Sequence, residues 1–206
     1  MLDGYFGNLH WWPGDSVFEV IIGAILTQNT AWRNVTLAMT KLKEAGIVSP
    51  AELEQVETHD LERLIKSSGF YRVKTRRLKA FSYFLQVEFE SSLELLTSEE
   101  VGKLRKKLLQ VYGIGEETAD SILLYACQKP IFVVDAYTRR ILSRHAVVSE
   151  AAEYSSIQNV FMSNLPLAAP LYNQYHALLV STGKQFCKTM KHCKDCPLGT
   201  LPPYQG

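Results

Sequence analysis

Two short stretches of the sequence combine residue types that can do chemistry. Near the C-terminal end, CKTMKHCKDCP separates Cys187 from Cys193 by five residues and Cys193 from Cys196 by two. In the middle, VYGIGEETAD places Gly113 and Gly115 directly before a predicted helix. Closely spaced thiols can ligate a metal ion or an iron–sulfur cluster, and a glycine turn can offer backbone N–H groups to an anion. The sequence thus contains a candidate metal centre and a candidate phosphate-binding turn.

The glycine turn has two interpretations. Gly113 and Gly115 allow positive φ and a close approach of another backbone, and Ile114 between them can tuck under the turn. N–H groups at the start of the next helix would then point outward together and form an anion nest. Glu116 and Glu117 suit the dipole of that helix but argue against a purely electrostatic grip on phosphate. The alternative is an ordinary helix–helix corner.

Composition limits the kinds of partner. The chain has 206 residues, 47% of them hydrophobic, and a formal net charge of +1. This length allows one domain or two small ones, and the charge gives no global field of either sign. A nucleic-acid partner would therefore have to be held by local basic patches. The candidates are Lys74, Arg76 and Arg77; Arg139, Arg140 and Arg144; and Lys188, Lys191 and Lys194.

The expected cellular compartment helps to decide whether the cysteines form disulfides or bind a metal. No stretch has the uninterrupted apolar length of a membrane helix, and the N-terminal residues MLDGYFGNLHWWPGD show no signal-peptide pattern. We therefore expect a cytoplasmic protein with no membrane partner. In a reducing compartment, closely spaced thiols are better explained by metal or cluster ligation than by disulfides.

Helical patterns cover almost the whole chain. VFEVIIGAILTQNT is apolar nearly all round, and either Asp15 or Ser16 can cap it, which predicts a buried central helix. The one stretch that reads as extended, KPIFVVD, is short. The sequence therefore predicts an all-α protein of about ten helices.

Four separated stretches, in order, resemble the helix-hairpin-helix DNA glycosylase superfamily, specifically its endonuclease III branch. They are GAILTQNTAWRNV, IKSSGFYRVKTRRL, VYGIGEETADSILLYA and VVDAYTRRILSR, and the cysteine tail also fits. The subgroup with the greatest likeness includes a 3-methyladenine DNA glycosylase. The resemblance implies two helical subdomains flanking a DNA-binding cleft. Residues 16–126 would carry the hairpin, and residues 1–15 with 127–206 would carry the catalytic aspartate and the cysteine loop.

The resemblance also assigns the reaction. Residues 112–115 (Tyr112, Gly113, Ile114 and Gly115) would bind a phosphate beside the lesion, often with a monovalent cation. The essential aspartate falls on Asp135, whose carboxylate can stabilise an oxocarbenium-like sugar and orient water. Without that context, Asp135 would be interpreted as the N-cap of the helix AYTRRIL, and it can fill both roles.

Glu117 departs from the pattern of the bifunctional members. They carry a lysine here, whose amine forms a Schiff base with the sugar and permits strand cleavage. A glutamate cannot do this, so we expect a monofunctional glycosylase with water as nucleophile. The alternatives are a bifunctional enzyme acting on oxidised pyrimidines and a DNA-binding relative without catalysis. The glutamate of the adenine-mismatch branch falls on Gly23, which disfavours that specificity.

Residues for base extrusion are also implied. Gln28 and Phe70 correspond to the two wedges that enter the duplex, since a glycosylase must take its base out of the stack. Trp32, with Trp11 and Trp12, corresponds to the base pocket of the alkyl-purine subgroup, where an indole attracts a cationic base. The alternative for Gln28 is an ordinary polar residue at a helix end, and the alternative for Phe70 and the tryptophans is core packing. The expected partner is double-stranded DNA with alkylated purines, bound by a monomer with Arg139 among the DNA contacts.

The cysteine tail departs from the family pattern as well. Many relatives place four cysteines around a [4Fe–4S] cluster, the fourth about six residues after the third. Here PLGTLPPYQG follows Cys196 without a cysteine, and Cys127 is better interpreted as a core residue. Three interpretations stay open. The first is a cluster with three thiolates, whose fourth ligand comes from elsewhere or was a cysteine lost with a truncated or altered C-terminus. The others are a zinc ion with His192 as fourth ligand and a metal-free tail. The role of a cluster would be structural.

Overall fold

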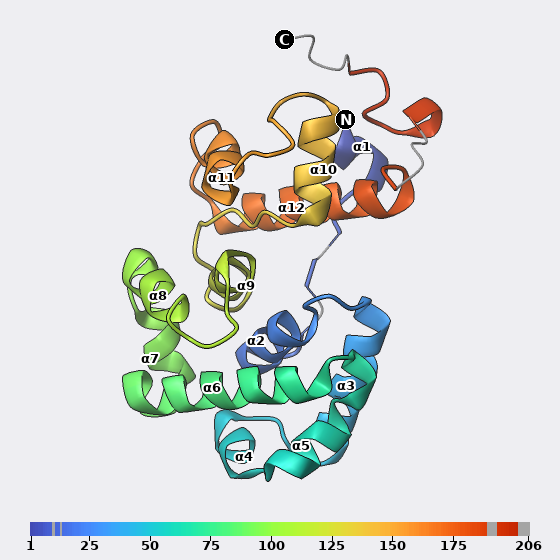
Figure 1. Cartoon of the computed structure of the whole chain (residues 1–206). Coiled ribbons are helices and arrows are strands. Elements are labelled where there is room, and N and C mark those ends of the chain that lie inside the picture. Colours follow the sequence, from blue (N-terminus) through green and yellow to red (C-terminus); the bar gives the residue numbers. More distant parts are fainter. Residues whose placement is uncertain (10, 13, 189–192, 202–206) are drawn as a thin grey trace. The chain divides into compact units, whose positions relative to one another are not determined.

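The structure is a computed structural model that describes all residues except 10, 13, 189–192 and 202–206 (Figure 1). Within these described residues the chain forms helices joined by turns and contains no β-strand. The prediction of an all-α protein is therefore confirmed. None of the described helices combines the length and apolar character needed to cross a bilayer.

The chain divides into two compact units. The first, here called the hairpin unit, is Trp12–Gln128, and the second, the terminal unit, is Met1–Trp11 with Lys129–Gly206. The divisions therefore follow residues 11 and 128, whereas the sequence interpretation placed them after residues 15 and 126.

The hairpin unit is built around a buried helix, α2 (Val17–Leu26). Ser16 caps it by accepting a hydrogen bond from Glu19 N at 3.2 Å, and every residue from Val20 to Leu26 is buried. This confirms the prediction of a central apolar helix. The other elements of this unit are α3 (Trp32–Glu44), α4 (Pro50–Gln55), α5 (Thr58–Leu64), η1 (Lys66–Ser68), α6 (Tyr71–Phe89), α7 (Leu93–Ser98), α8 (Val101–Leu108), α9 (Glu116–Ser121) and the π-helical turn η2 (Ile122–Ala126).

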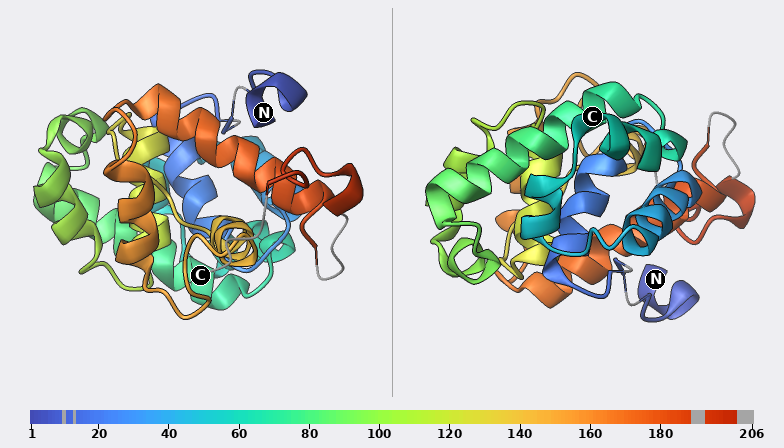
Figure 2. Two further views of the ribbon diagram at one scale, coloured as in Figure 1. Left: turned by 90° about the horizontal axis from the view of Figure 1, so that it is seen from above. Right: turned by 90° about the horizontal axis from the view of Figure 1, so that it is seen from below.

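The long helix α6 organises the rest of the hairpin unit. It runs between α2 on one side and α4 and α5 on the other, as Figures 1 and 2 show. Helix α2 also packs against α3, α9 and η2. The helices on both sides of the glycine turn, α8 and α9, are therefore held against a rigid core.

The terminal unit is built on the helix α12 (Ala169–Gln185). This helix packs against α10 (Ala136–Arg144) and α1 (Leu2–Phe6). The unit also contains α11 (Tyr154–Met162) and the short turn η3 (Cys193–Asp195).

The stretch predicted as extended leads into α10 without forming a strand. Phe132 is buried and stacks on Phe161 with ring centroids 3.7 Å apart. Gln158 Nε2 donates a hydrogen bond to Phe132 O at 2.6 Å. These contacts fix the backbone that precedes Asp135.

Candidate functional site

The glycine turn between α8 and α9 requires a glycine at one of its two positions. Gly113 has φ 78°, and a Cβ there would collide with the side chain of Arg77. Gly115 has φ −94° and open space around its Cβ direction, so sterics alone do not demand glycine there. Ile114 is buried and Tyr112 is exposed. The turn is therefore anchored by an apolar residue and presents its backbone beside the start of α9.

A buried ion pair joins the two helices of the hairpin. Arg105 on α8 makes a bidentate contact with Asp120 on α9, with Nε–Oδ1 at 2.7 Å and Nη2–Oδ2 at 3.1 Å. Asp120 is fully buried, and Glu116 Oε1 lies 3.5 Å from the same guanidinium. This pair sets the angle between the helices, because the fork of an arginine fixes both carboxylate oxygens.

The first wedge candidate lies on the hairpin. Gln28 follows α2, and its Nε2 donates to Gly113 O at 3.0 Å and to Thr118 Oγ1 at 2.8 Å. Arg77 donates to the Gln28 side-chain oxygen. The structure therefore brings Gln28 and the glycine turn together through a polar network that the sequence did not reveal.

The second wedge candidate is a surface residue. Phe70 is 71% exposed and has φ 46° at the N-cap of α6. Four residues later, Lys74 is buried and donates to Ser68 O at 2.6 Å. Burial lowers the pKa of Lys74 to about 8, and the charge of Arg77 adds to this effect. Lys74 thus holds the loop before Phe70.

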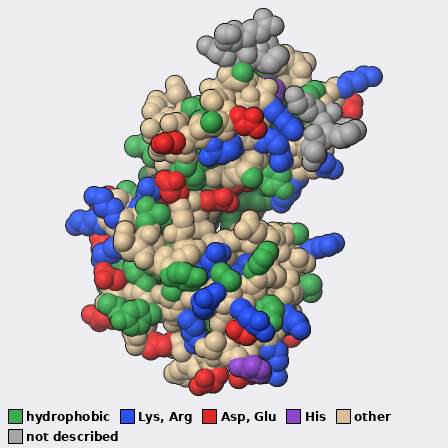
Figure 3. Space-filling view, in the orientation of Figure 1, with side chains coloured by type: hydrophobic (Ala, Val, Ile, Leu, Met, Phe, Trp, Pro, Cys, Tyr) green, Lys and Arg blue, Asp and Glu red, His purple; other side chains and the backbone are tan. Residues whose placement is uncertain are grey.

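The predicted basic sets do not all face solvent. Lys74 belongs to the interior, Arg77 bonds Gln28, and Arg139 donates to Ala152 O. Arg140 lies over the ring of Tyr137. On the face drawn in Figure 3, Lys and Arg side chains are interspersed with Asp and Glu side chains. Lys191, like His192, lies outside the described residues.

The position assigned to the lyase lysine carries an exposed carboxylate. Glu117 lies in the first turn of α9, and its carbonyl accepts a hydrogen bond from Ser121 Oγ at 2.7 Å. The side chain itself is exposed, in contrast to Asp120 one turn later.

Three aromatic rings surround Gly23. Trp12 stacks on Tyr125 with centroids 4.6 Å apart and meets Trp32 edge-on at 5.3 Å. A Cβ at Gly23 would lie 3.3 Å from Trp32 and 3.6 Å from Trp12 Nε1, so a longer side chain would have to displace the indoles. Trp11 belongs to the other unit, where Lys184 Nζ lies 5.1 Å from its ring centroid. Thus Trp12 and Trp32 come together, with Tyr125 as a third member.

Asp135 caps α10 and contacts a buried histidine. Its Oδ1 accepts a hydrogen bond from Thr138 N at 2.7 Å and lies 3.8 Å from His176 Nε2 on α12. The Asp135 side chain is 12% exposed. Burial by itself raises the pKa of this carboxyl, but His176 and Thr138 together outweigh it and hold the pKa below its ordinary value. Asp135 is therefore an ionised carboxylate at a rigid helix start.

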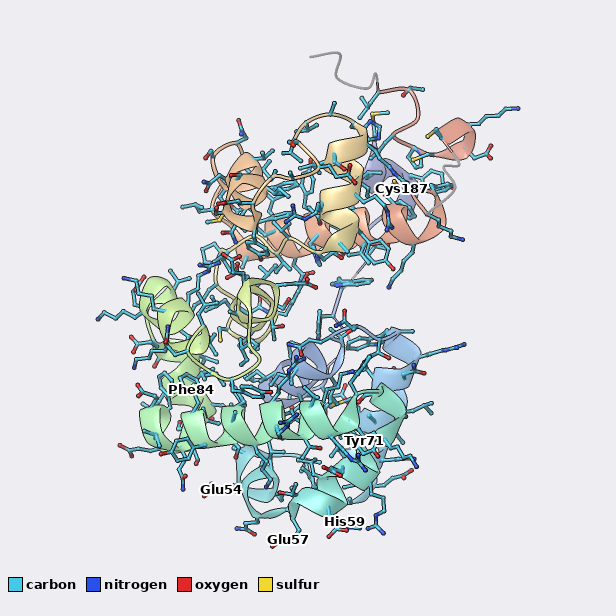
Figure 4. All side chains as sticks on the ribbon, viewed as in Figure 1. Glu54, Glu57, His59, Tyr71, Phe84 and Cys187 are labelled. Atoms are coloured by element: carbon cyan, nitrogen blue, oxygen red, sulfur yellow. The ribbon has the colours of Figure 1, made fainter. Side chains whose placement is uncertain are left out.

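The three tail cysteines line one cavity of about 200 Å³ in the terminal unit. Arg144 and His145 at the end of α10 also line it, and Arg144 Nη1 lies 3.2 Å from Cys187 Sγ. Cys187 follows α12 at the edge of the tail (Figure 4). Burial raises the pKa of Cys196, and Cys187 and Cys193 add to the rise. Within the described residues, no three His, Cys, Asp or Glu side chains converge on the position of a single metal ion.

The family model described as "HhH-GPD superfamily base excision DNA repair protein" matches residues 22–167. The chain belongs to the HhH-GPD superfamily. The resemblance inferred from the sequence motifs is thereby confirmed, and the chain is a DNA repair glycosylase whose substrate is DNA.

Relatives support the endonuclease III-like branch of the HhH-GPD superfamily. A protein of Methanocaldococcus jannaschii named "Putative DNA repair glycosylase" is 42% identical over 195 residues, which cover 94% of this chain and 89% of that protein. Endonuclease III of Sulfolobus acidocaldarius is 29% identical over 183 residues, covering 88% and 79%.

Solved HhH-GPD structures have the same fold. The 3-methyladenine DNA glycosylase of H. pylori bound to 1,N6-ethenoadenine is 30% identical, with a TM-score of 0.75 and coverage of 89% of this chain and 92% of that one. A non-covalent endonuclease III–DNA complex is 22% identical, with a TM-score of 0.83 and coverage of 98% and 90%. The second likeness concerns the fold alone.

Sequence reasoning missed three residues of these sites: Tyr125, His145 and His176 become candidates only through segments far away in the chain. It did name Lys74, but as a member of a basic surface patch, whereas Lys74 is buried. The sequence offered a signal for His176 alone, because this polar residue lies in the apolar helical stretch HALLV.

Proposed function

We propose that the protein is a monofunctional DNA glycosylase that releases alkylated purines such as 3-methyladenine, with water as the nucleophile. The observation that carries the proposal is the carboxylate of Glu117 at the position where bifunctional relatives have a lysine. A carboxylate cannot form the Schiff base that leads to strand cleavage. The product would therefore be an abasic site in an intact strand.

Asp135 supplies the charge that this reaction needs. Breaking an N-glycosidic bond builds positive charge on the sugar, and a fixed carboxylate stabilises it and orients the attacking water. Since the pKa of Asp135 lies below its ordinary value, the group is ionised at neutral pH. His176, 3.8 Å away, offsets the desolvation of this buried carboxylate.

The aromatic cluster supports a cationic base as the leaving group. Trp12 and Trp32 present indole rings, which attract a positively charged purine. Stacking of a base on an aromatic ring contributes about 1–3 kcal/mol. A cationic base also leaves without protonation, in agreement with a site that has one ionised carboxylate. The bound ethenoadenine of the H. pylori enzyme is likewise a modified adenine.

The hairpin and the two wedge candidates would hold the DNA. The backbone of Tyr112–Gly115 would bind a phosphate, with a monovalent cation at the turn, and Arg139 would add a contact. Phe70 is exposed and held at a left-handed helix start, which suits insertion into a duplex. Gln28 would enter the duplex after exchanging its bonds to the turn for contacts with DNA. The protein would act as a monomer.

A [4Fe–4S] cluster fits the cysteine cavity better than a single ion. A structural zinc ion requires ligands that converge to about 2.0–2.3 Å from one point, whereas Cys187, Cys193 and Cys196 surround a cavity of about 200 Å³. These three thiolates would hold the cluster, and Arg144 would stabilise the charge on Cys187. When bound, the cluster would link the tail to α10 and α12, with no step in base release.

A panel of duplexes tests the proposal. Oligonucleotides with 3-methyladenine, ethenoadenine, thymine glycol or uracil are incubated with the protein, and released base is separated from cleaved strand. We expect release of the alkylated purines, with strand breaks appearing only after alkali treatment. Borohydride trapping on the same duplexes should give no covalent adduct. An efficient adduct, or release confined to oxidised pyrimidines, would favour the bifunctional alternative.

A further inference from the structure

The cysteine cavity offers three thiolates to a cluster that has four iron atoms. Cys187, Cys193 and Cys196 are the cysteines among the described residues that line this cavity, and Cys127 belongs to the hairpin unit. A fourth ligand from the cavity wall would therefore be a different residue type.

His145 has the required donor atom. It is the C-cap residue of α10 and lines the same cavity as the three cysteines. Its Nδ1 is buried and has no hydrogen-bond partner among the described residues. Buried polar atoms are normally paired, so an unpaired imidazole nitrogen beside three thiols needs an explanation. Imidazole nitrogen is also an accepted ligand of iron.

The other polar residues of the wall do not supply a comparable ligand. Arg144 has no lone pair to donate, and its guanidinium is hydrogen-bonded to Cys187 Sγ and to Lys188 O. The Thr182 hydroxyl donates to Leu178 O within α12. Among these side chains, His145 is the one with a neutral nitrogen donor available.

We propose that His145 is the fourth ligand of the cluster and binds it through Nδ1, beside Cys187, Cys193 and Cys196. The inference rests on the cluster proposed above but not on the lesion or the mechanism of base release. Ligation uses the neutral imidazole, so it changes no oxidation state. Because a neutral ligand replaces a thiolate, the cluster carries one negative charge fewer, and its reduction potential is higher than with four cysteines.

Pulsed electron paramagnetic resonance tests the ligand directly. The full chain is produced with ¹⁵N-labelled histidine, purified without oxygen, analysed for iron and sulfide, and reduced by one electron. We expect a hyperfine coupling from a nitrogen bound to the cluster. In His145→Cys the cluster should persist, the nitrogen coupling should vanish, and the reduction potential should fall. Circular dichroism checks that each variant folds.

His192→Gln is the matched control, since His192 is the histidine within the cysteine motif. This variant should keep both the nitrogen coupling and the potential of the wild type. A wild-type cluster without nitrogen coupling, a coupling that survives in His145→Cys, or one that disappears in His192→Gln would overturn the proposal. Purified protein without iron would overturn it too.

The base-release panel separates this inference from the proposed function. An iron-free protein that releases alkylated purines would remove the cluster and leave the glycosylase proposal standing. A protein that holds a nitrogen-ligated cluster but releases no base would support His145 as a ligand and contradict the glycosylase proposal.

Discussion

The starts of α9 and α10 carry the same kind of side chain in different surroundings. Glu117 is an exposed carboxylate in the first turn of α9, whereas Asp135 is a buried cap of α10 that contacts Thr138 and His176. Both positions suit the helix dipole. The Asp135 carboxylate is held by Thr138 N, and His176 and Thr138 keep its pKa below the ordinary value. The comparison therefore teaches that the surroundings of a carboxylate, and not its residue type alone, fit it for the role proposed here for Asp135.

The largest expected effect is at the start of α10. Asp135→Asn keeps a side chain that can cap the helix but removes the charge, so the fold should persist. We expect single-turnover base release to fall by about 10²–10⁴-fold, the contribution typical of a positioned acid or base. The exposed residue Asp60, changed to Asn, is the control and should behave as wild type. Equal rates in the two variants would remove Asp135 from the mechanism.

The next largest effect is expected at His176, which contacts Asp135 at the start of α10. In the wild type, the low pKa of Asp135 keeps it ionised, so activity should be lost only at pH below the ordinary carboxyl range. His176→Gln removes the contact that lowers this pKa while burial, which raises it, persists. The acid limb of the rate profile should therefore move to higher pH.

This prediction is checked by measuring base release against pH. The exposed His59, changed to Gln, serves as the matched control and should leave the acid limb unchanged. An acid limb that stays in place in His176→Gln would contradict the positioning role, even if the overall rate declined.

A smaller effect is expected at the turn that precedes α9. Gly113→Ala places a side chain at positive φ and against Arg77, which should destabilise the protein by about 1–3 kcal/mol and weaken DNA binding. Gly115→Ala meets open space at an ordinary φ, so its stability should stay near that of wild type. Denaturant unfolding and DNA titration measure both. Equal losses in the two variants would contradict the asymmetry of the turn.

The smallest effect is expected at Glu117 itself. Glu117→Gln removes an exposed charge without disturbing Asp120, so base release should remain within about two-fold of wild type. Single-turnover kinetics are the measurement. A large loss would show that the carboxylate takes part in catalysis, and the contrast between the starts of α9 and α10 would disappear.

The sequence by itself determined the helical fold, the buried helix α2 and the glycine turn. The capped apolar helix α2 and the glycine turn have signatures within a few neighbouring residues, so capping patterns and periodicity predict them. The collision that would exclude a Cβ at Gly113 depends on Arg77, which is distant in the sequence. The motifs around Asp135 and the glycine turn were also sufficient to identify the family. Their site roles stay proposals, because no pattern reports a bound lesion.

Only the tertiary structure decided which residues from distant segments of the chain contact one another. Lys74 is buried against the loop before Phe70, Tyr125 stacks on Trp12, and His176 lies beside Asp135, 41 positions away in the sequence. His145 meets the cysteine cavity in the same way. These contacts join distant segments, and their energies depend on burial and distance in three dimensions, which the order of residues along a chain does not specify.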